Sequence, residues 1–477
     1  MKIWLFIVSV MVSANGLAAP QQTPAPDDSS AQRRALLEAV IPADWQRFRQ
    51  REPVFDSELF WVEAGPRDAP TVLMVHGLGS DGLRSLLPSL QALVGRYRII
   101  APDLPGFGLS EQPRGHYSPT RYARLLHWLV KQRAGKAVVV VGHSMGGAVA
   151  LRFAGSYPQQ VERLVLVSSA GVLERSAFLR HAASLPVPLE GVPDVVNGVV
   201  DSMRQYGSAL LDWTGLMPDP AALLQSSDVV WDALTRGQPN INAALCLVGE
   251  DYSAVIASLE VPVYLIWGTD DAITPPRTGR LLAGRLRRAQ LTEIIGAGHM
   301  PMATHTELFN QLLLEALAAR GTGQPYWRRP APVQRPPDLL CRGKSGGVYQ
   351  GYYARVELDH CDNATLMNVT ASSLSIVDST VDAYNLSVSA KEGAAIAVSD
   401  SDLTITNAEL SGDVAVSATG SKLDLAGVSL RVRERAIVSA QESSLTISVS
   451  DLESPGFSGA LHGAYRLADD SLDAQLR

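Results

Sequence analysis

One serine in this chain has neighbours that could make it a nucleophile. Ser144 lies in the segment GHSMG (142–146), which follows four consecutive valines and precedes the helix-like segment AVALRFAGSY (148–157). Because a run of β-branched residues favours a buried strand, the serine is expected at a sharp turn from strand to helix. Glycines two positions before and after the serine suit such a turn, since larger side chains would collide there. The pattern is that of a G-x-S-x-G nucleophile elbow, and its flanking elements make the prediction specific.

Candidates for a general base and an orienting acid follow downstream. A serine hydroxyl is a poor nucleophile at neutral pH, so it needs a histidine to accept its proton and a carboxylate to orient that histidine. Asp270 and Asp271 follow a candidate strand in the segment LIWGTDDAITPP, and His299 follows the next candidate strand in IIGAGHMP. The sequence therefore predicts a triad of Ser144, His299 and one of the two aspartates.

The elements that would position these residues begin at about residue 55. From there the sequence alternates between strand-like and helix-like segments, which implies a mostly parallel sheet with helices on both faces. A further helix is predicted over 306–320, with Gly321 as its C-cap, and a helical lead-in is predicted over 31–51. The predicted strands are 59–62, 71–75, 98–101, 137–141, 164–168, 263–267 and 290–295.

Residues 55–320 resemble the α/β-hydrolase superfamily, in its cap-bearing, esterase-like branch. HGLGS (76–80) is similar to the family's oxyanion loop, and DLPGFGLS (103–110) to its D-x-x-G-x-G-x-S turn. GHSMGG (142–147) is the elbow, and WGTDD with the later GH carries the acid and the base. The resemblance implies an α/β-hydrolase fold with a helical cap. The cap is expected over about 171–240, where the alternation gives way to a mainly helical insertion whose apolar residues could line an acyl pocket.

The resemblance also implies a role for each matching residue. Ser144 is the nucleophile and His299 the general base. Asp271 rather than Asp270 is the orienting acid, because the family pattern G-x-x-D with a proline four residues later fits Gly268, Asp271 and Pro275. The backbone N–H groups of Leu78 and Met145 match the oxyanion hole, in which one donor supplies about 3 kcal/mol of transition-state stabilisation.

Three other motif residues are expected to be structural rather than catalytic. They are His76 and His143, which occupy commonly structural positions, and Asp103, which is expected to hydrogen-bond local backbone N–H groups. The chain departs from the family at Thr304-His305-Thr306, where relatives carry E-x-P. This departure leaves the triad intact and concerns only the support of the His299 loop.

A second region follows the hydrolase-like one. Residues 321–338 are rich in Pro and Arg and are expected to form an extended linker, and 339–477 lack long helical patterns. The segments AVSDSDLTI, VSATGSKLDL and VSAQESSLTI align so that Leu403, Leu423 and Leu445 recur at spacings of 20 and 22 residues, with SSLSI (372–376) as an earlier copy. This period predicts a C-terminal all-β domain that is a small β-solenoid, with a β-sandwich as the alternative.

The first residues indicate an exported protein, periplasmic or secreted. Lys2 precedes an apolar run (3–12) that is short for a membrane span, and a small-x-small site follows at 16–18. Residues 1–18 are therefore predicted to be a cleaved signal peptide, with an uncleaved anchor as the alternative, and 19–54 a tether and lead-in. Because export permits disulfides, Cys341 and Cys361 are expected to pair and Cys246 to be a buried free thiol.

Composition narrows the classes of partner. A formal net charge of −7 gives no reason to expect nucleic acid or an anionic membrane surface as a partner. The nine histidines and three cysteines show no metal-ligand spacing, so neither a metal nor a cofactor is expected. The sequence gives no basis for predicting the oligomeric state.

Together these patterns predict an exported serine hydrolase that cleaves small-molecule or lipid carboxylic esters through an acyl-enzyme on Ser144. The serine nucleophile argues against haloalkane dehalogenases and epoxide hydrolases, which resemble this chain but attack with an aspartate. Carbon–carbon bond hydrolysis and acyl transfer on the same fold are alternatives. A hypothesis from another class is a binding protein whose C-terminal β-domain recognises a surface polymer or another protein.

Overall fold

The structure is a computed structural model that describes residues 28–174, 231–232, 235–319, 321 and 333–476. The predicted signal peptide, most of the tether, most of the cap and most of the linker lie outside these residues. The chain divides into two compact units, Met1–Pro42 and Ala43–Arg477. The described residues of the first unit, 28–42, include helix α2 (Asp28–Ala39). None of the helices in the described ranges has the length and apolar character of a membrane span.

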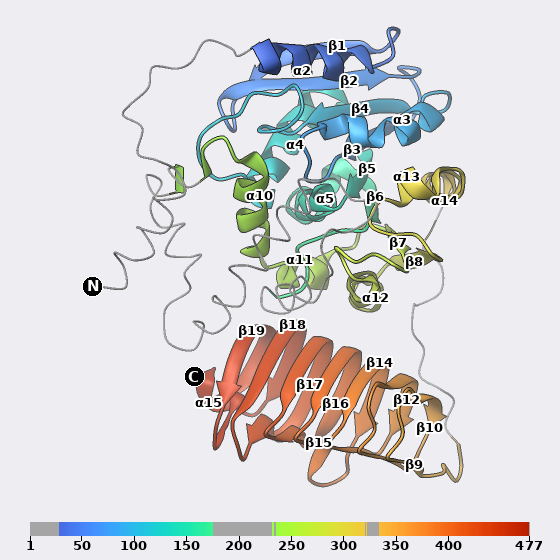
Figure 1. Ribbon diagram of the computed structural model, residues 1–477, viewed down its shortest axis with the longest axis vertical. Helices are drawn as coiled ribbons and strands as arrows, with labels where there is room; N and C mark the ends of the chain where they lie inside the picture. Colours follow the sequence, from blue (N-terminus) through green and yellow to red (C-terminus); the bar gives the residue numbers. More distant parts are fainter. Residues whose placement is uncertain (1–27, 175–230, 233–234, 320, 322–332, 477) are drawn as a thin grey trace, which may run out of the picture. The chain divides into compact units, whose positions relative to one another are not determined.

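The second unit contains an eight-stranded sheet, with the strand order β1-β2-β4-β3-β5-β6-β7-β8 (Figure 1). β2 pairs antiparallel with β1 and β4, whereas all pairs from β4 to β8 are parallel. The central strands β3 and β5 are buried along their whole length, as expected for strands covered on both faces. The strands are β1 (Gln46–Glu52), β2 (Ser57–Ala64), β3 (Thr71–Val75), β4 (Arg98–Asp103), β5 (Val138–His143), β6 (Val161–Val167), β7 (Val263–Gly268) and β8 (Ala289–Ile294).

Helices pack on both faces of this sheet, which confirms the predicted α/β architecture. α3 packs with α13 and α14, while α4 and α11 pack with α5. Two short 3₁₀ helices, η1 (Gly82–Leu86) and η2 (Pro158–Gln160), lie in the connections. The α-helices are α3 (Leu87–Leu93), α4 (Pro119–Arg133), α5 (Met145–Ser156), α10 (Pro239–Val248), α11 (Ser253–Ser258), α12 (Pro276–Arg285), α13 (Pro301–Thr304) and α14 (Thr306–Ala318).

Each predicted strand overlaps an observed strand, but two helix predictions need correction. The predicted lead-in helix over 31–51 is wrong beyond Ala39, because Gln46–Glu52 form the edge strand β1. Pairing with β2 and the stacking of Phe48 on Trp61, with ring centroids 5.1 Å apart, outweigh the local helical pattern. The predicted helix over 306–320 ends at Ala318, and Gly321 is not its C-cap because Ala319 is already extended.

The C-terminal domain is all-β, and its strands stack side by side in a curled sheet (Figure 1). Strands β9 to β18 pair in parallel, and the long strands β16 and β17 each pair along both sides of the curled sheet. β19 pairs antiparallel with β18 and ends the stack. The predicted solenoid-like domain is thus confirmed over the alternative of a β-sandwich. Its elements are β9 (Leu339–Arg342), β10 (Val348–Tyr352), β11 (Arg355–Asp359), β12 (Ala364–Ala371), β13 (Ser373–Val377), β14 (Thr380–Ser389), β15 (Ala394–Ser399), β16 (Asp402–Thr419), β17 (Lys422–Ser439), β18 (Ser443–Ser454), β19 (Phe457–Leu467), β20 (Asp470–Ser471) and α15 (Leu472–Gln475).

The leucine repeat has the predicted register. Leu403 pairs with Leu423, and Leu423 pairs with Leu445, so the three side chains stack in one column of the core. The prediction that SSLSI is an earlier copy is wrong, because Leu374 pairs with Ile396 in a different column. The strands that contribute to both columns alternate small polar and apolar residues, since each strand has one face in the core and one outside. Local similarity therefore could not tell which column a segment joins.

Two further columns shape the coils. Asn368, Asn385, Asn407, Gly427 and Val449 occupy equivalent corners and all have positive φ, between 47° and 67°. At another corner the backbone N–H of one coil donates to the serine hydroxyl of the next. This serine ladder runs from Cys361 through Ser379, Ser401 and Ser421 to Ser443, with N···O distances of 2.8 to 3.2 Å.

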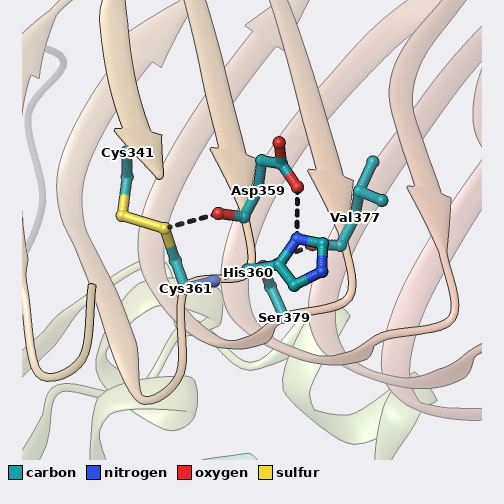
Figure 2. Close-up of a disulfide and its surroundings, with 6 residues drawn as sticks. All are labelled: Cys341, Asp359, His360, Cys361, Val377 and Ser379. Carbon is teal, nitrogen blue, oxygen red and sulfur yellow. Dashed lines mark hydrogen bonds and ion pairs between the residues drawn. A yellow bond between two sulfur atoms is a disulfide. The ribbon is translucent and has the colours of Figure 1, made fainter. Parts of the chain in front are cut away.

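A disulfide closes the first coil, as predicted. Cys341 and Cys361 are bonded, and Cys361 is the first member of the serine ladder beside Ser379 (Figure 2). Cys246 is a buried free thiol, also as predicted. The covalent bond joins segments 20 residues apart, so it restricts the unfolded chain at the start of the stack.

Candidate active site

Ser144 lies at the turn between β5 and α5, where the elbow motif places it. Its backbone has φ 54° and ψ −120°, a combination that residues with a side chain rarely adopt. A Cβ at Gly142 would overlap the carbonyl oxygen of Gly146, and a Cβ at Gly146 would overlap the carbonyl oxygens of Val75 and His76. The two glycines are therefore required by close backbone approach, as the sequence predicts.

His299 joins Ser144 to Asp271. Its Nε2 is 3.0 Å from Ser144 Oγ, and its Nδ1 is 3.0 and 3.1 Å from the two carboxylate oxygens of Asp271. All three residues are buried, with exposed fractions of 7% for Ser144, 2% for Asp271 and 7% for His299. Because Nδ1–H donates to the carboxylate, Nε2 is left as an acceptor that faces the serine hydroxyl. This is the hydrogen-bonded chain that proton transfer from the serine requires.

The loop after β7 fixes the Asp271 carboxylate. Oδ1 accepts the backbone N–H groups of Ile273 and Thr274 at 3.0 and 2.9 Å, and Oδ2 lies 2.8 Å from the Thr274 hydroxyl. Burial alone would raise the pKa of the Asp271 carboxyl, but the electrostatic interaction with His299 and the hydrogen bonds from His299 and Thr274 together lower it. Asp271 therefore remains ionised at neutral pH.

The structure separates the two candidate acids. Asp270 is exposed, and its carboxylate accepts the hydroxyl of Thr269 at 2.8 Å rather than contacting His299. Thr274 was not identified from the sequence as part of the site. Its position three residues after an aspartate, ahead of two prolines, is a signal for a side chain that closes a carboxylate-centred turn.

The loop that carries Leu78 lies against the nucleophile. A Cβ at Gly77 would approach Ser144 Cβ to 2.9 Å, so this backbone passes directly over the serine. Met145 begins α5, where the first N–H groups have no partner within the helix. The neighbouring Gly79 N–H donates to Asn240 Oδ1 at 3.0 Å. Asn240, from α10, is a support of this loop that the sequence did not reveal.

The two other motif histidines have structural hydrogen bonds. His76 Nδ1–H donates to Gly77 O at 2.7 Å and Nε2 accepts Leu104 N–H at 2.9 Å, while burial lowers its pKa. His143 Nε2–H donates to His299 O at 2.9 Å, and burial together with the nearby His299 lowers the pKa of His143 to about 3. Both imidazoles are therefore neutral near pH 7 and hold the backbone around the site.

Asp103 has more contacts than the sequence suggested. It accepts the local Leu109 N–H at 2.8 Å, but also the distant Leu83 N–H at 2.7 Å. Its Oδ2 also pairs with Arg84 Nη1 at 2.6 Å, and both side chains are almost fully buried. Arg84 was not predicted, because nothing near it in the sequence marks its partner. The pair joins the end of β4 to the segment after the Leu78 loop.

His305 lies at the departure from the family pattern. It precedes α14, and its Nδ1 is 3.0 Å from the Thr304 hydroxyl. It does not contact the triad. Within the described ranges, no group of three or more histidine, cysteine or acidic side chains is arranged to hold a metal ion.

Comparison with known proteins places this site in a family. The family model for the alpha/beta hydrolase fold matches residues 70–306. An uncharacterized protein of Mycobacterium tuberculosis is 31% identical in an alignment 287 residues long, which covers 54% of this chain and 82% of that protein. The chain therefore belongs to the α/β-hydrolase family.

The relatives that carry a functional name include a magnesium-chelatase subunit and a lipase. The magnesium-chelatase 30 kDa subunit of Rhodobacter capsulatus is 31% identical over 278 residues, covering 55% of this chain and 92% of that subunit. Lipase 1 of Psychrobacter immobilis is 28% identical over 254 residues, covering 51% of this chain and 76% of the lipase. The chain is a hydrolase of the α/β family with lipases among its relatives.

Proposed function

We propose that the protein is an exported serine hydrolase that cleaves carboxylic esters through an acyl-enzyme on Ser144. The observation that carries the proposal is the hydrogen-bonded chain Asp271–His299–Ser144, with each link at 3.0 Å. Such a chain is the arrangement that activates a serine hydroxyl for attack on a carbonyl carbon.

In the first half of the reaction, Ser144 Oγ attacks the ester carbonyl while its proton passes to His299 Nε2. The ionised Asp271 stabilises the imidazolium and keeps its ring oriented. The negative charge on the former carbonyl oxygen is met by the N–H groups of Leu78 and Met145. Collapse of the tetrahedral intermediate breaks the bond to the alcohol, which leaves with the proton from His299.

In the second half, water attacks the acyl group on Ser144 and His299 takes a proton from that water. A second tetrahedral intermediate collapses, the carboxylic acid leaves, and the proton returns to Ser144 Oγ. The net reaction consumes one water and releases the alcohol and the acid without a redox step, so the triad and the two N–H donors are sufficient for it.

Small-molecule or lipid esters are the proposed substrates. Support comes from the lipase among the relatives and from the sequence of residues 1–18, which has the pattern of a signal peptide. An exported enzyme meets esters outside the cytoplasm, whereas carbon–carbon bond hydrolases commonly act on intracellular catabolites.

The test is hydrolysis of p-nitrophenyl esters from acetate to palmitate by the purified mature protein. Ser144→Ala should lower kcat by on the order of 10⁶-fold, because the nucleophile is removed while the fold is kept. His299→Ala should have a comparable effect, and His305→Ala, which lies six residues further along and outside the triad, should have little. The chain-length optimum then measures the acyl pocket.

Two results would contradict the proposal. One is folded wild-type protein that turns over none of these esters, which would direct the search to carbon–carbon hydrolysis, acyl transfer or binding. The other is turnover that survives in Ser144→Ala, which would place the reaction elsewhere in the chain.

A further inference from the structure

Helix α12 is packed on two sides. Its inner side lies on β7 and β8, where a Cβ at Gly279 would come within 2.8 Å of the Trp267 ring. Its outer side carries residues at i, i+3, i+4, i+7 and i+8, which share one face of a helix. These residues are Arg277, Arg280, Leu281, Gly284 and Arg285, and they contact the coils of the C-terminal β-domain within the same compact unit.

Arg277 makes the most extensive of these contacts. Its Nη1 and Nη2 each lie 2.8 Å from one oxygen of the Asp424 carboxylate, and its Nε donates to Thr406 Oγ1 at 2.8 Å. The Arg277 and Asp424 side chains are only 14% and 20% exposed. A bidentate pair of this kind is geometrically specific, and removal of one partner is costly because the other charge stays largely buried.

The surfaces beside this ion pair fit closely. Asn407, at a corner of the solenoid, donates through Nδ2 to the carbonyl oxygen of Arg280 at 2.7 Å. A Cβ at Gly284 would overlap the Asn407 side chain, and a Cβ at Gly427 would come within 2.5 Å of Leu281 Cδ1. Two other residues of the β-domain, Ala426 and Val449, belong to the hydrophobic core of the α/β region. These two residues extend the core of the α/β region to the β-domain, whose other buried apolar residues form a separate core.

A second ion pair secures the far end of the helix. Arg285 Nη2 lies 2.6 Å from Asp451 Oδ1, and its Nη1 donates to Ser429 Oγ at 3.0 Å. The Arg285 and Asp451 side chains are 22% and 35% exposed. This pair resembles the Arg277 pair in chemistry but lies two turns of helix further from the acid loop.

The near end of α12 continues directly from the loop that holds the catalytic acid. Thr274, which binds Asp271 through its N–H and its hydroxyl, is followed by Pro275 and by Pro276, the first residue of the helix. Two successive prolines restrict the backbone between Thr274 and Arg277. A shift of Arg277 is therefore passed to Thr274 rather than absorbed by a flexible connection.

We infer that the C-terminal β-domain positions the catalytic acid, with Arg277 and Asp424 as positioning residues that fix the start of α12. The inference rests on the proposed esterase function, since it assigns a role to that site. It differs from the surface-recognition role predicted from the sequence, which stays a prediction. Removal of the whole β-domain would expose the apolar face around Leu281, so variants of the full chain are the appropriate test.

The test compares Asp424→Asn with Asp451→Asn in the full-length protein, with the active sites counted by a fluorophosphonate that labels Ser144. Asp424→Asn should lower kcat about 10-fold and leave KM within twofold, because small displacements of a catalytic group are costly. It should also speed hydrogen exchange at the Ile273 and Thr274 amides, which donate to Asp271. Asp451→Asn should change kcat by less than threefold, although it loosens the same interface.

Arg277→Lys is the second variant, because it keeps the charge but cannot make the bidentate pair. It should show the same kcat decrease in milder form. The inference is overturned if Asp424→Asn and Arg277→Lys fold and keep the wild-type kcat and exchange rates, or if Asp451→Asn reproduces their kcat loss. If the wild-type protein turns over no ester, only the proposed function is contradicted. The hydrogen-exchange rates at Ile273 and Thr274 in the variants would still decide whether the β-domain positions Asp271.

Discussion

The elbow at Ser144 and the corner column of the solenoid both place residues other than glycine at positive φ. Ser144 has φ 54°, and Asn407 in the corner column has φ 59°. At the elbow the conformation occurs once, is held by backbone packing against two glycines, and aims one side chain at a histidine. In the solenoid it recurs in five successive coils, and the asparagine Asn385 donates to Asn368 of the preceding coil at 2.9 Å.

The difference shows that positive φ by itself does not mark a catalytic residue. Asparagine adopts this region more readily than other residues, so a column of asparagines costs little. A serine with ψ near −120° is more strained, and it persists because its surroundings determine its position. A single residue at positive φ with a proton acceptor beside it, such as Ser144 with His299, indicates a functional site. Positive φ at the same corner of successive coils indicates a repeated bend of the backbone.

The largest effect is expected from a substitution of Asp271, the acid that holds His299 against the elbow serine. Asp271→Asn should lower kcat by about 10⁴-fold, because the amide cannot orient and stabilise a protonated His299. Asp270→Asn is the matched control, since its exposed carboxylate contacts Thr269 instead. Steady-state hydrolysis of a soluble ester measures both. Equal losses in the two variants would mean that the site is not organised around Asp271.

A smaller effect is expected on the pH dependence of stability. His143 has a pKa of about 3 in the folded protein, below the 6.5 usual for the unfolded chain. Between pH 3 and 6.5 the imidazole of residue 143 is protonated in the unfolded chain but neutral in the folded protein. The contribution of His143 to the free energy of unfolding is therefore complete above pH 6.5 and is lost as the pH falls toward 3. In His143→Gln, stability should therefore fall less steeply with acidification, by up to about 1.4 kcal/mol per pH unit.

Urea unfolding from pH 7.5 to 4 measures this effect. Above pH 7 the difference between His143→Gln and wild type should be constant, since both states then bind the same protons. Parallel stability curves across the whole range would contradict a neutral, buried His143.

The smallest effect tests the corner column. Gly427→Ala and Gly393→Ala both place a side chain at positive φ, 67° and 71°, which costs about 1–2 kcal/mol. Only at Gly427 would the new Cβ meet Leu281, whereas nothing lies within 4 Å at Gly393. Denaturant unfolding should therefore show an additional loss of about 1–3 kcal/mol for Gly427→Ala. Equal losses would show that α12 is not closely packed against this corner.

The site was largely predictable because its signals are local. The elbow, the order of acid and histidine, and the buried valine strand each depend on a few adjacent residues. The supports of the site were less visible. Thr274 bonds to Asp271 three residues before it, whereas Arg84 and Asn240 act on Asp103 and Gly79, which the fold brings close.

The β regions were predictable in kind but not in detail. Leucine spacing identified the solenoid, yet the same alternation on both sides of the coil misassigned SSLSI. β1 has a single apolar side chain, Phe48, and its strand form depends on pairing with β2. The outer face of α12 contains arginines that would be expected in solvent from the sequence, because their partners Asp424 and Asp451 lie 147 and 166 residues further along the chain.

The stacked coils leave the length of the β-domain free to vary. In the serine ladder each coil donates to the next, so adjacent coils depend mainly on local contacts. The coils that meet α12 carry Asn407, Gly427 and Asp451, whereas the disulfide closes the stack at its start. Duplication or loss of a coil between these two places would lengthen or shorten the domain without altering the surface that α12 meets. The α/β-hydrolase region and the length of the β-domain can therefore change independently in evolution.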